Sequence, residues 1–293
     1  MDQLPKQPSP AALFGPGFRV MLLLTLFFCC GGIFSLLGYI PGLEFMQAEN
    51  DSITIAQMRI ANALGTLLVF VVPALVVTNV FPPNRFYWLG LHQRTPLWWL
   101  VAAAVIMLAM VFVANPIAEW MAGIISDPGI IKSEAETALY STQIQYMPSA
   151  GDYISCLFIL ALLPAIAEEL FFRAALLQLV AVWFRNKHIA VLFSALVFAF
   201  LHATVAGLPA IFLCGVILGY LFMWTGSLRV SIIGHFVFNA FEITNTYINQ
   251  ISPDSSWAKW MPGIGIVIGA ALLAAAVLFA LYKNTRNHPN QLL

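Results

Sequence analysis

The sequence predicts an all-α, polytopic membrane protein with eight transmembrane helices and both termini in the cytoplasm. Three observations predict this: the composition, the length of the apolar runs and the distribution of Lys and Arg. Of the 293 residues, 61% are apolar and only 9% are charged, whereas a soluble domain carries about 25% charged residues. So few charges cannot cover a surface that faces water. An outer-membrane barrel is also excluded, because its strands alternate apolar and polar residues instead of running apolar for about twenty.

Eight apolar runs have the length, or nearly the length, that a bilayer crossing requires. They are Phe18–Ile40, Ile60–Phe81, Leu97–Ile117, Tyr153–Phe184, Ile189–Thr204, Leu208–Trp224, Val230–Ile248 and Pro262–Tyr282. The fourth run is too long for a straight crossing and contains Pro164, which predicts a kink, a tilt or an interfacial extension. The fifth run is short.

The loops between these runs predict the orientation. With the N-terminus inside, most Lys and Arg residues fall on the cytoplasmic side, as the positive-inside rule requires. These are Lys6, Arg19, Arg85, Arg94, Arg185, Lys187, Arg229, Lys283 and Arg286, against Arg59, Lys132 and Lys259 outside. An odd number of spans destroys this asymmetry, so both termini are predicted to be cytoplasmic.

The second outer loop is long and acidic. Its Ser133-x-x-Glu136 pattern matches a capping box, which predicts a short surface helix that begins there and runs toward Tyr146. The net charge of the chain is zero and no basic tract occurs, so nothing indicates a nucleic-acid partner.

Ionisable residues are confined to the later spans, and the first cluster is in the fourth run. An ionisable group inside a span is costly and is by default a functional hypothesis. Glu169 and Arg173 are separated by four residues with the acid first, the favourable order for an ion pair. Adjacent helical residues point about 100° apart, so Glu168 and Glu169 are not expected to share one partner. Pairing Glu169 with Arg173 leaves Glu168 as an unneutralised carboxylate that suits a general base or acid.

Two further clusters follow on other spans. The fifth run carries Phe198 and His202, and the seventh carries His235, Asn239 and Glu242. The last three residues follow an i, i+4, i+7 pattern, so they are predicted to share one face that looks into the bundle. A histidine and an amide one turn apart can offer two donors to a single oxygen, as an oxyanion hole requires. For Glu242 an interhelical hydrogen bond is an equally fair interpretation.

These three clusters resemble the motifs of the CPBP intramembrane proteases. Glu168-Glu169-x-x-x-Arg173, Phe198-x-x-x-His202 and His235-x-x-x-Asn239 are similar, in this order, to those of the type II CAAX prenyl endopeptidases and their bacterial Abi, or bacteriocin-processing, relatives. The resemblance covers about Tyr153–Ile248 and divides the chain into residues 1–152, a catalytic core at 153–248 and residues 249–293. It implies a multi-pass protein of the bacterial inner membrane that acts within the lipid bilayer on a membrane-associated protein or peptide, prenylated or leader-bearing.

The same resemblance implies roles for the matched residues. Glu168 with His202 would activate a water molecule, His235 and Asn239 would hold the oxyanion, and Glu169, Arg173, Phe198 and Glu242 would support them. The family includes enzymes described as metalloproteases and as glutamate proteases. His202, His235 and Glu168 can supply the three ligands of one catalytic zinc ion. A Glu–His base with a His–Asn oxyanion hole needs no metal, and we favour that chemistry.

Two other classes of function use some of the same residues. In a proton-coupled transporter, Glu168, His202, His235 and Glu242 would relay protons, but transporters of this size usually repeat their polar interruptions in both halves and the first three spans have no ionisable residue. In a haem protein, His202 and His235 would be axial ligands, which leaves the carboxylates without a role.

The helical rise poses a geometric condition for any shared site. His202 lies about 20 Å along its span from Ile189, whereas His235 lies about 8 Å from Val230, at 1.5 Å per residue. For the two side chains to meet, the fifth helix must be strongly tilted or begin below the membrane plane. We therefore expect a fifth helix that is strongly tilted or begins below the membrane plane, and a wedge-shaped, water-filled cavity that opens on the cytoplasmic side or laterally to lipid. We also expect the Glu168 carboxylate to lie within about 8 Å of at least one imidazole.

Overall fold

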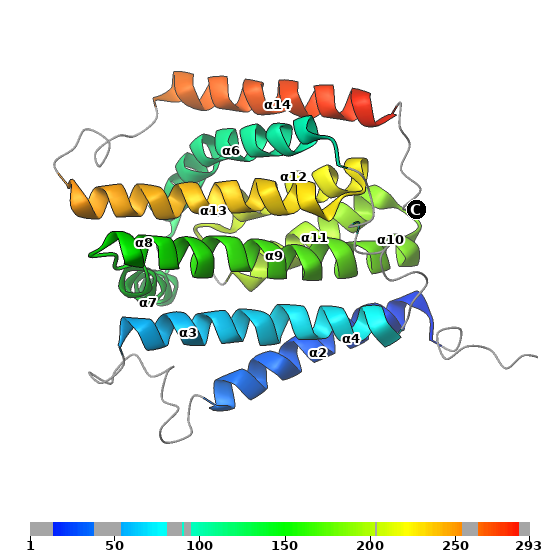
Figure 1. Ribbon diagram of the computed structural model, residues 1–293, viewed down its shortest axis with the longest axis horizontal. Helices are drawn as coiled ribbons and strands as arrows, with labels where there is room; N and C mark the ends of the chain where they lie inside the picture. Colours follow the sequence, from blue (N-terminus) through cyan, green and yellow to red (C-terminus); the bar gives the residue numbers. More distant parts are fainter. Residues whose placement is uncertain are drawn as a thin grey trace, which may run out of the picture.

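A computed structural model describes residues 14–37, 54–80, 90, 95–202, 204–253 and 263–286. In these ranges every regular element is a helix (Figure 1), so the all-α prediction is confirmed for the described part of the chain. The α-helices are α2 (Pro16–Leu37), α3 (Ile55–Thr66), α4 (Val72–Val80), α6 (Leu97–Ile124), α7 (Pro128–Ile144), α8 (Ala150–Cys156), α9 (Leu163–Glu169), α10 (Gln178–Phe184), α11 (Lys187–Leu201), α12 (Leu208–Thr225), α13 (Leu228–Ile251) and α14 (Ile264–Arg286). Wider π-helical turns, η1 (Leu67–Val71), η2 (Leu157–Leu162) and η3 (Leu170–Leu177), join α3 to α4, α8 to α9 and α9 to α10.

Six of the eight predicted spans are helices of sufficient length and apolarity to cross a membrane. In the described residues these are Pro16–Leu37, Ile55–Asn79, Leu97–Ile124, Ala150–Phe184, Leu208–Thr225 and Ile264–Thr285. The fifth predicted span is the shorter apolar helix Lys187–Leu201. The seventh is α13, which has 24 residues but carries the polar side chains of the third cluster. The chain is therefore an integral, multi-pass membrane protein.

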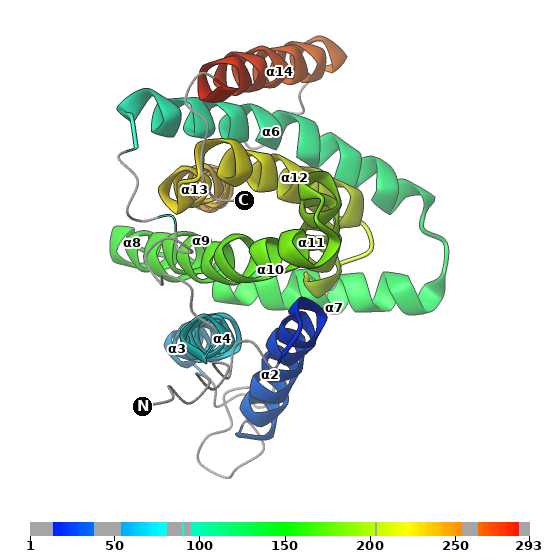
Figure 2. The ribbon, with the colours of Figure 1, turned by 90° about the vertical axis from the view of Figure 1, so that its right-hand side faces the viewer.

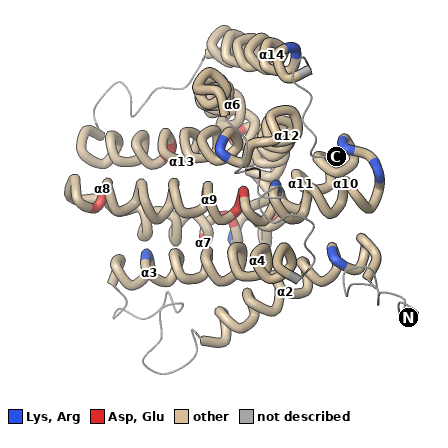
Figure 3. Tube along the Cα trace, turned by 45° about the vertical axis from the view of Figure 1, so that its right-hand side comes forward, with Lys and Arg blue, Asp and Glu red and all other residues tan. Residues whose placement is uncertain are grey.

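Most of the long helices run alongside one another (Figure 1), and charged residues lie at both of their ends as well as in the middle, on α9 and α13 (Figure 3). At one end α6 begins against the end of α14, where the Trp99 indole donates to Asn284 (3.2 Å). Gly17, at the start of α2, packs there against Trp183. This end, which we call the basic end, carries Arg19, Arg185, Lys187, Arg229, Lys283 and Arg286. The opposite end, the acidic end, carries Asp127, Glu134, Glu136 and Asp152 beside Arg59 and Lys132.

Helix α7 lies across the acidic end, nearly perpendicular to α13 (Figure 2). The predicted capping box at Ser133 is wrong, because the helix begins earlier, at Pro128. The Asp127 carboxylate caps it by accepting from the Ile130 amide (2.9 Å). An Asp followed by Pro supplies both a capping oxygen and a preset backbone angle, so these two residues start the helix before Ser133 is reached.

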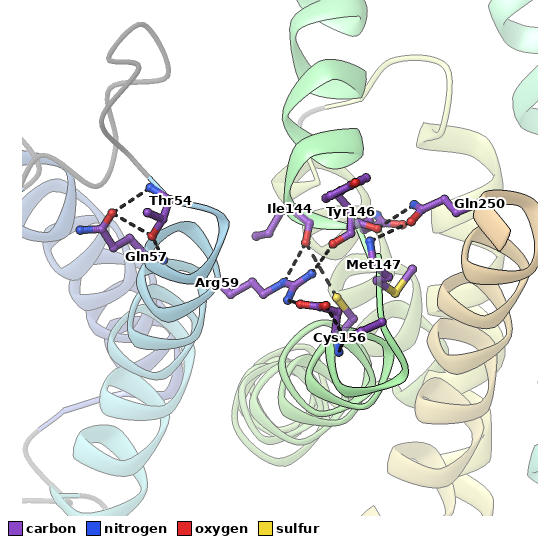
Figure 4. Close-up of polar contacts among 11 residues, drawn as sticks. Thr54, Gln57, Arg59, Ile144, Tyr146, Met147, Cys156 and Gln250 are labelled. Carbon is purple, nitrogen blue, oxygen red and sulfur yellow. Dashed lines mark hydrogen bonds and ion pairs between the residues drawn. The ribbon is translucent and has the colours of Figure 1, made fainter.

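Arg59 connects the helices of the acidic end. Its side chain is on the predicted outer side, yet the residue is only 5% exposed. Its guanidinium donates to the carbonyl of Ile144 (3.1 Å), the carbonyl of Tyr146 (2.7 Å) and the carboxylate of Asp152 (2.9 Å; Figure 4). These bonds tie α3 to the end of α7 and the start of α8. Arg59 therefore departs from the positive-inside pattern because it is a paired structural residue and not a surface charge.

Replacing Arg59 by Met is expected to lower the free energy of unfolding by about 3 kcal/mol, because the variant leaves the Asp152 carboxylate and two carbonyls without their donor. Thermal unfolding of the purified protein in detergent measures the effect. The matched control is Lys132→Met, whose ammonium lies 3.8 Å from Glu136 on the exposed face of α7. We expect a change of less than about 0.5 kcal/mol for the control. Equal effects of the two substitutions would contradict this role.

Residues 150–184 form one uninterrupted helical rod, in which Pro164 does not end the helix. Proline removes a backbone donor and crowds the preceding turn. The π-turns of η2 end at Leu162, just before Pro164, and such wider turns accommodate a break in the hydrogen-bond ladder. The second π segment, η3, begins directly after Glu169. This rod packs against α11, α12 and α13, so the first polar cluster faces the other two.

Candidate active site

The second glutamate of the pair is the most deeply buried acidic residue of the site. Glu169 is fully buried, and its Oε1 accepts from the Arg173 guanidinium (2.6 Å), which confirms the predicted ion pair. The same oxygen accepts from Nδ1 of His235 on α13 (2.9 Å). The two glutamates were predicted not to share one partner on the same face, and in the structure His235 is hydrogen-bonded to Glu169 alone but also lies 3.9 Å from Glu168. An imidazole has two nitrogens on different edges, and His235 presents one to each glutamate.

Arg173 links three helices around this pair. It is 1% exposed, and its second terminal nitrogen donates to the carbonyl of Gly215 on α12 (3.2 Å). Its guanidinium carbon also lies 4.8 Å from the centre of the Phe198 ring on α11. Arginine suits this position because its planar fork serves several partners at once. Arg173 thus fixes Glu169, α11 and α12 relative to one another.

His202 is oriented by its own helix. It follows the last turn of α11, and its Nδ1 lies 2.8 Å from the carbonyl oxygen of Phe198. A carbonyl only accepts, so Nδ1 carries the hydrogen and Nε2 of the neutral ring keeps a lone pair. The Phe198 ring packs on the imidazole, with ring centres 4.5 Å apart. Phe198 therefore holds His202 through both its backbone and its side chain.

His235 is also held through Nδ1, but by a charged partner. Its Nδ1 donates to the Glu169 carboxylate, which leaves Nε2 directed at Glu168. The side chain is 6% exposed, against 34% for His202. The two imidazoles therefore have different supports, a neutral carbonyl behind His202 and a carboxylate behind His235.

Both imidazoles face Glu168 on α9. Oε2 of Glu168 lies 4.0 Å from Nε2 of His202 and 3.9 Å from Nε2 of His235. Both distances are well below the limit of about 8 Å that the sequence analysis set for Glu168 and an imidazole. They are too long for direct hydrogen bonds and of the length that one bridging water molecule spans. Oε2 is buried and accepts no hydrogen bond from the described residues. We call Glu168, His202 and His235 the Glu–His centre.

The inclination of α11 explains how the two histidines meet. In Figure 2, α13 is seen nearly end-on, whereas α11 and α12 run at an angle to it. The predicted tilt of the fifth helix is therefore present. It brings the far end of α11, where His202 lies, beside His235, near the start of α13.

A cavity of about 300 Å³ adjoins the Glu–His centre between α6, α11, α12 and α13. His202 and His235 contribute to its wall, together with Asn239 and Glu242. The predicted common face of α13 is thus confirmed. The Asn239 amide makes no hydrogen bond within the described part of the chain, so its donors are available to a molecule in the cavity. Most of the other lining is apolar, including Met107, Ala114, Ala210, Ile211, Leu218 and Phe238.

Two polar residues near the cavity were missed by the sequence analysis. Asn115 of α6 donates to Oε1 of Glu242 (3.0 Å) and lines the same cavity. Glu134 of α7 accepts from the Thr204 hydroxyl (2.9 Å) and the Val205 amide (2.6 Å), in the segment that follows His202. The sequence does indicate Asn115 as a candidate, because it is an amide inside an apolar run. The sequence gives no such indication for Glu134, since it is one of several acidic residues in a predicted outer loop.

The comparisons with known proteins bear on the rod and the helices that follow it. The family model "Type II CAAX prenyl endopeptidase Rce1-like" matches residues 150–241. This segment of the chain is therefore similar to an Rce1-like domain. No curated protein and no solved structure matched the chain. The Rce1-like match agrees with the resemblance to the CPBP family and implies a membrane endopeptidase.

The Rce1-like domain includes the whole Glu–His centre and Asn239, since all four residues lie between 150 and 241. It also includes Glu169, Arg173 and Phe198. Glu242, Asn115 of α6 and Glu134 of α7 lie outside the matched residues. The wall of the cavity therefore includes residues of the matched segment, such as His235 and Asn239, and residues outside it, such as Asn115 and Glu242.

The three residues considered as zinc ligands do not fit a zinc ion as they are placed. Ligands of a tetrahedral zinc ion, at about 2.0–2.2 Å from the metal, lie roughly 3.3–3.5 Å apart. The Glu168 oxygen lies farther than that from each imidazole, at 4.0 and 3.9 Å. In the described residues no group of three or more His, Cys, Asp or Glu side chains has an arrangement that could hold a metal ion.

Treatment with phenanthroline is therefore expected to leave the rate of any peptide cleavage by the protein unchanged, because Glu168, His202 and His235 are not placed as the ligands of a zinc ion. The measurement is the cleavage rate of the purified protein before and after dialysis against the chelator. A known zinc protease treated in parallel must lose its activity. A loss that is restored by added Zn²⁺ would overturn the expectation.

Proposed function

We propose that the protein is an intramembrane endopeptidase that hydrolyses a peptide bond of a membrane-associated protein or peptide. The observation that carries the proposal is the Glu–His centre, in which the Nε2 atoms of two oriented imidazoles lie about one water molecule away from the Glu168 carboxylate. The apolar wall of the adjoining cavity supports a substrate that enters from the bilayer, such as a prenylated or leader-bearing chain.

Glu168 and His202 activate the water. The carboxylate takes one proton from the water as its oxygen attacks the carbonyl carbon of the scissile bond. His202 accepts a hydrogen bond from the same water at Nε2, because its Nδ1–H is held by the Phe198 carbonyl. This arrangement aims the lone pair of the attacking oxygen away from both bases and toward the substrate.

His235 stabilises the charge that develops on the carbonyl oxygen. A proton on Nε2 makes it a charged donor, and the Glu169 carboxylate at Nδ1 balances that charge. These four groups of the centre then sum to zero, with Glu168 and Glu169 negative and Arg173 and His235 positive. A neutral total matters here, because unpaired charges are costly inside a membrane protein. The different hydrogen-bond partners of the two imidazoles support these different roles.

Asn239 supplies the second donor to the oxyanion. It lies one turn beyond His235 on the same face of α13, and its free amide lines the cavity. The tetrahedral intermediate then collapses as the C–N bond breaks, and Glu168 returns its proton to the leaving nitrogen. The products are a new carboxyl terminus and a new amino terminus, with no covalent enzyme intermediate.

In the membrane, we propose eight crossings with the basic end in the cytoplasm and α7 on the outer surface. Positively charged residues at helix ends favour the cytoplasmic side. The start of α2, the end of α10, the start of α13 and the end of α14 lie at one end (Figure 1), and Arg19, Arg185, Arg229 and Lys283 are at or next to these helix ends in the sequence. Helix α2 begins and α14 ends at this end (Figure 1), which supports cytoplasmic termini. A bacterial inner membrane fits this arrangement.

A comparison of membrane peptide fragments tests the proposed function. Cells that express the wild type and cells that express Glu168→Gln are compared by mass spectrometry of new protein termini in the membrane fraction. We expect fragments that occur only with the wild type, because glutamine keeps the shape of Glu168 but cannot accept the proton. Identical sets of termini at equal expression levels would contradict an endopeptidase role.

A further inference from the structure

Glu242 is a carboxylate in the cavity that the proposed reaction does not use. It lies two turns beyond His235 on the same face of α13 and lines the same cavity. Its Oε1 accepts one hydrogen bond, from Asn115 (3.0 Å). No ion pair between described residues includes Glu242.

Three other carboxylates among the described residues are compensated more fully, whereas Glu168, whose Oε2 accepts no hydrogen bond, belongs to the Glu–His centre. Glu169 has a guanidinium and an imidazole, Asp152 has a guanidinium, and Glu134 has a hydroxyl and a backbone amide. Glu242 has a single neutral amide, among side chains such as Ala114 and Ala118. A carboxylate in such apolar surroundings is costly without a cation. Apart from His235, whose Nδ1 is bonded to Glu169, the residues of the cavity wall supply none.

We propose that Glu242 and Asn115 form a specificity subsite that binds a basic side chain, Lys or Arg, of the substrate. Asn115 fixes the Glu242 carboxylate by holding Oε1, which leaves Oε2 for the ammonium or guanidinium. A charged hydrogen bond of this kind, in apolar surroundings, is strong and directional. The subsite rests on the proposed function, because it binds a side chain of the same substrate that the Glu–His centre cleaves.

The helical spacing sets the place of this basic residue in the substrate. Seven residues of α13 separate His235 from Glu242, a rise of about 10 Å at 1.5 Å per residue. An extended peptide advances about 3.3 Å per residue. The basic side chain therefore lies about three residues or fewer from the scissile bond, since the side chain adds its own reach.

A set of quenched fluorescent peptides, anchored to detergent micelles by an acyl chain, tests the subsite with the purified full-length protein. The peptides are apolar and identical except for one position, which is Lys, norleucine or Glu and is moved through the four positions on each side of the bond. We expect the wild type to prefer Lys to norleucine at one position by about tenfold or more in kcat/KM, as for a hydrogen bond to a charged group. Glu242→Gln is expected to remove this preference, and Glu242→Lys to replace it with a preference for Glu.

Asn115→Leu tests the same subsite through a residue of another helix, α6, and keeps the test valid if the Glu242 variants do not fold. It is expected to reduce the preference for Lys, because the carboxylate loses its anchor. Glu136→Gln, on the exposed face of α7, is the control and is expected to keep the preference. Cleavage without any preference for Lys, or a preference that persists in Glu242→Gln, would show that Glu242 and Asn115 form an interhelical hydrogen bond only, with the proposed function intact. Failure of the wild type to cleave any peptide faster than Glu168→Gln would overturn the proposed function and the subsite together.

Discussion

Replacing Glu168 by Gln is expected to slow peptide cleavage by a factor of about 10² to 10⁴, the contribution of a positioned general base. Glutamine keeps the volume and hydrogen-bonding reach of the side chain but cannot take a proton from water. The Glu168 oxygen is the atom that both imidazoles face, at 4.0 and 3.9 Å, so no neighbouring carboxylate occupies an equivalent place. Single-turnover rates with saturating enzyme measure the chemical step without the effects of substrate binding.

The control for Glu168→Gln is the same change at Glu136, which lies on the exposed face of α7. We expect wild-type rates for the control and the same thermal stability for both variants. Adding His202→Gln to Glu168→Gln is expected to cost little more, because residues that act as a unit on one water molecule are not additive. Cleavage by Glu168→Gln at more than about one-tenth of the wild-type rate would be incompatible with a general base at this position.

Removal of the Asn239 amide is expected to lower kcat by about 10² to 10³ with little change in KM, because an oxyanion donor acts mainly in the transition state. Asn239→Leu keeps a side chain of similar size on the cavity wall. Asn239→Asp is expected to be slower still, because it places a negative charge where the oxyanion forms. Steady-state kinetics of the two variants on one peptide provide the comparison.

Asn245→Leu is the matched control, since Asn245 is an amide on the same helix that is not part of the cavity wall. It is expected to retain the wild-type kcat. If Asn239→Leu raised KM and left kcat unchanged, Asn239 would be a substrate-binding residue and the second oxyanion donor would have to be sought elsewhere.

Much of the site could be predicted from the sequence because membrane spans penalise polar residues so strongly. Glu168, His202 and His235 are conspicuous in apolar runs, and the i, i+4, i+7 spacing of His235, Asn239 and Glu242 indicates a common face. The ion pair of Glu169 with Arg173 followed from their spacing alone. For this reason the helices that carry the site, and the face of α13 that lines the cavity, were expected before the structure was described.

The remaining features depend on contacts between helices that no local pattern records. His235 reaches both glutamates because α13 packs beside the rod at a particular height, and spacing along one helix cannot show that. The start of α7 was misplaced because the capping box was weighed without the stronger Asp127–Pro128 signal. Arg59 looked like an exception to the charge rule until its partners at the ends of α7 and α8 were known.

The central claim is that one water molecule is held between Glu168 and the two Nε2 atoms. A density map of the purified protein in a lipid nanodisc, at a resolution that shows ordered water, tests it directly. The expected result is a single water within hydrogen-bond distance, about 2.6–3.2 Å, of the Glu168 carboxylate and of at least one of the two imidazoles. A Glu168 carboxylate bonded directly to another protein group, or imidazoles turned toward lipid, would contradict the mechanism.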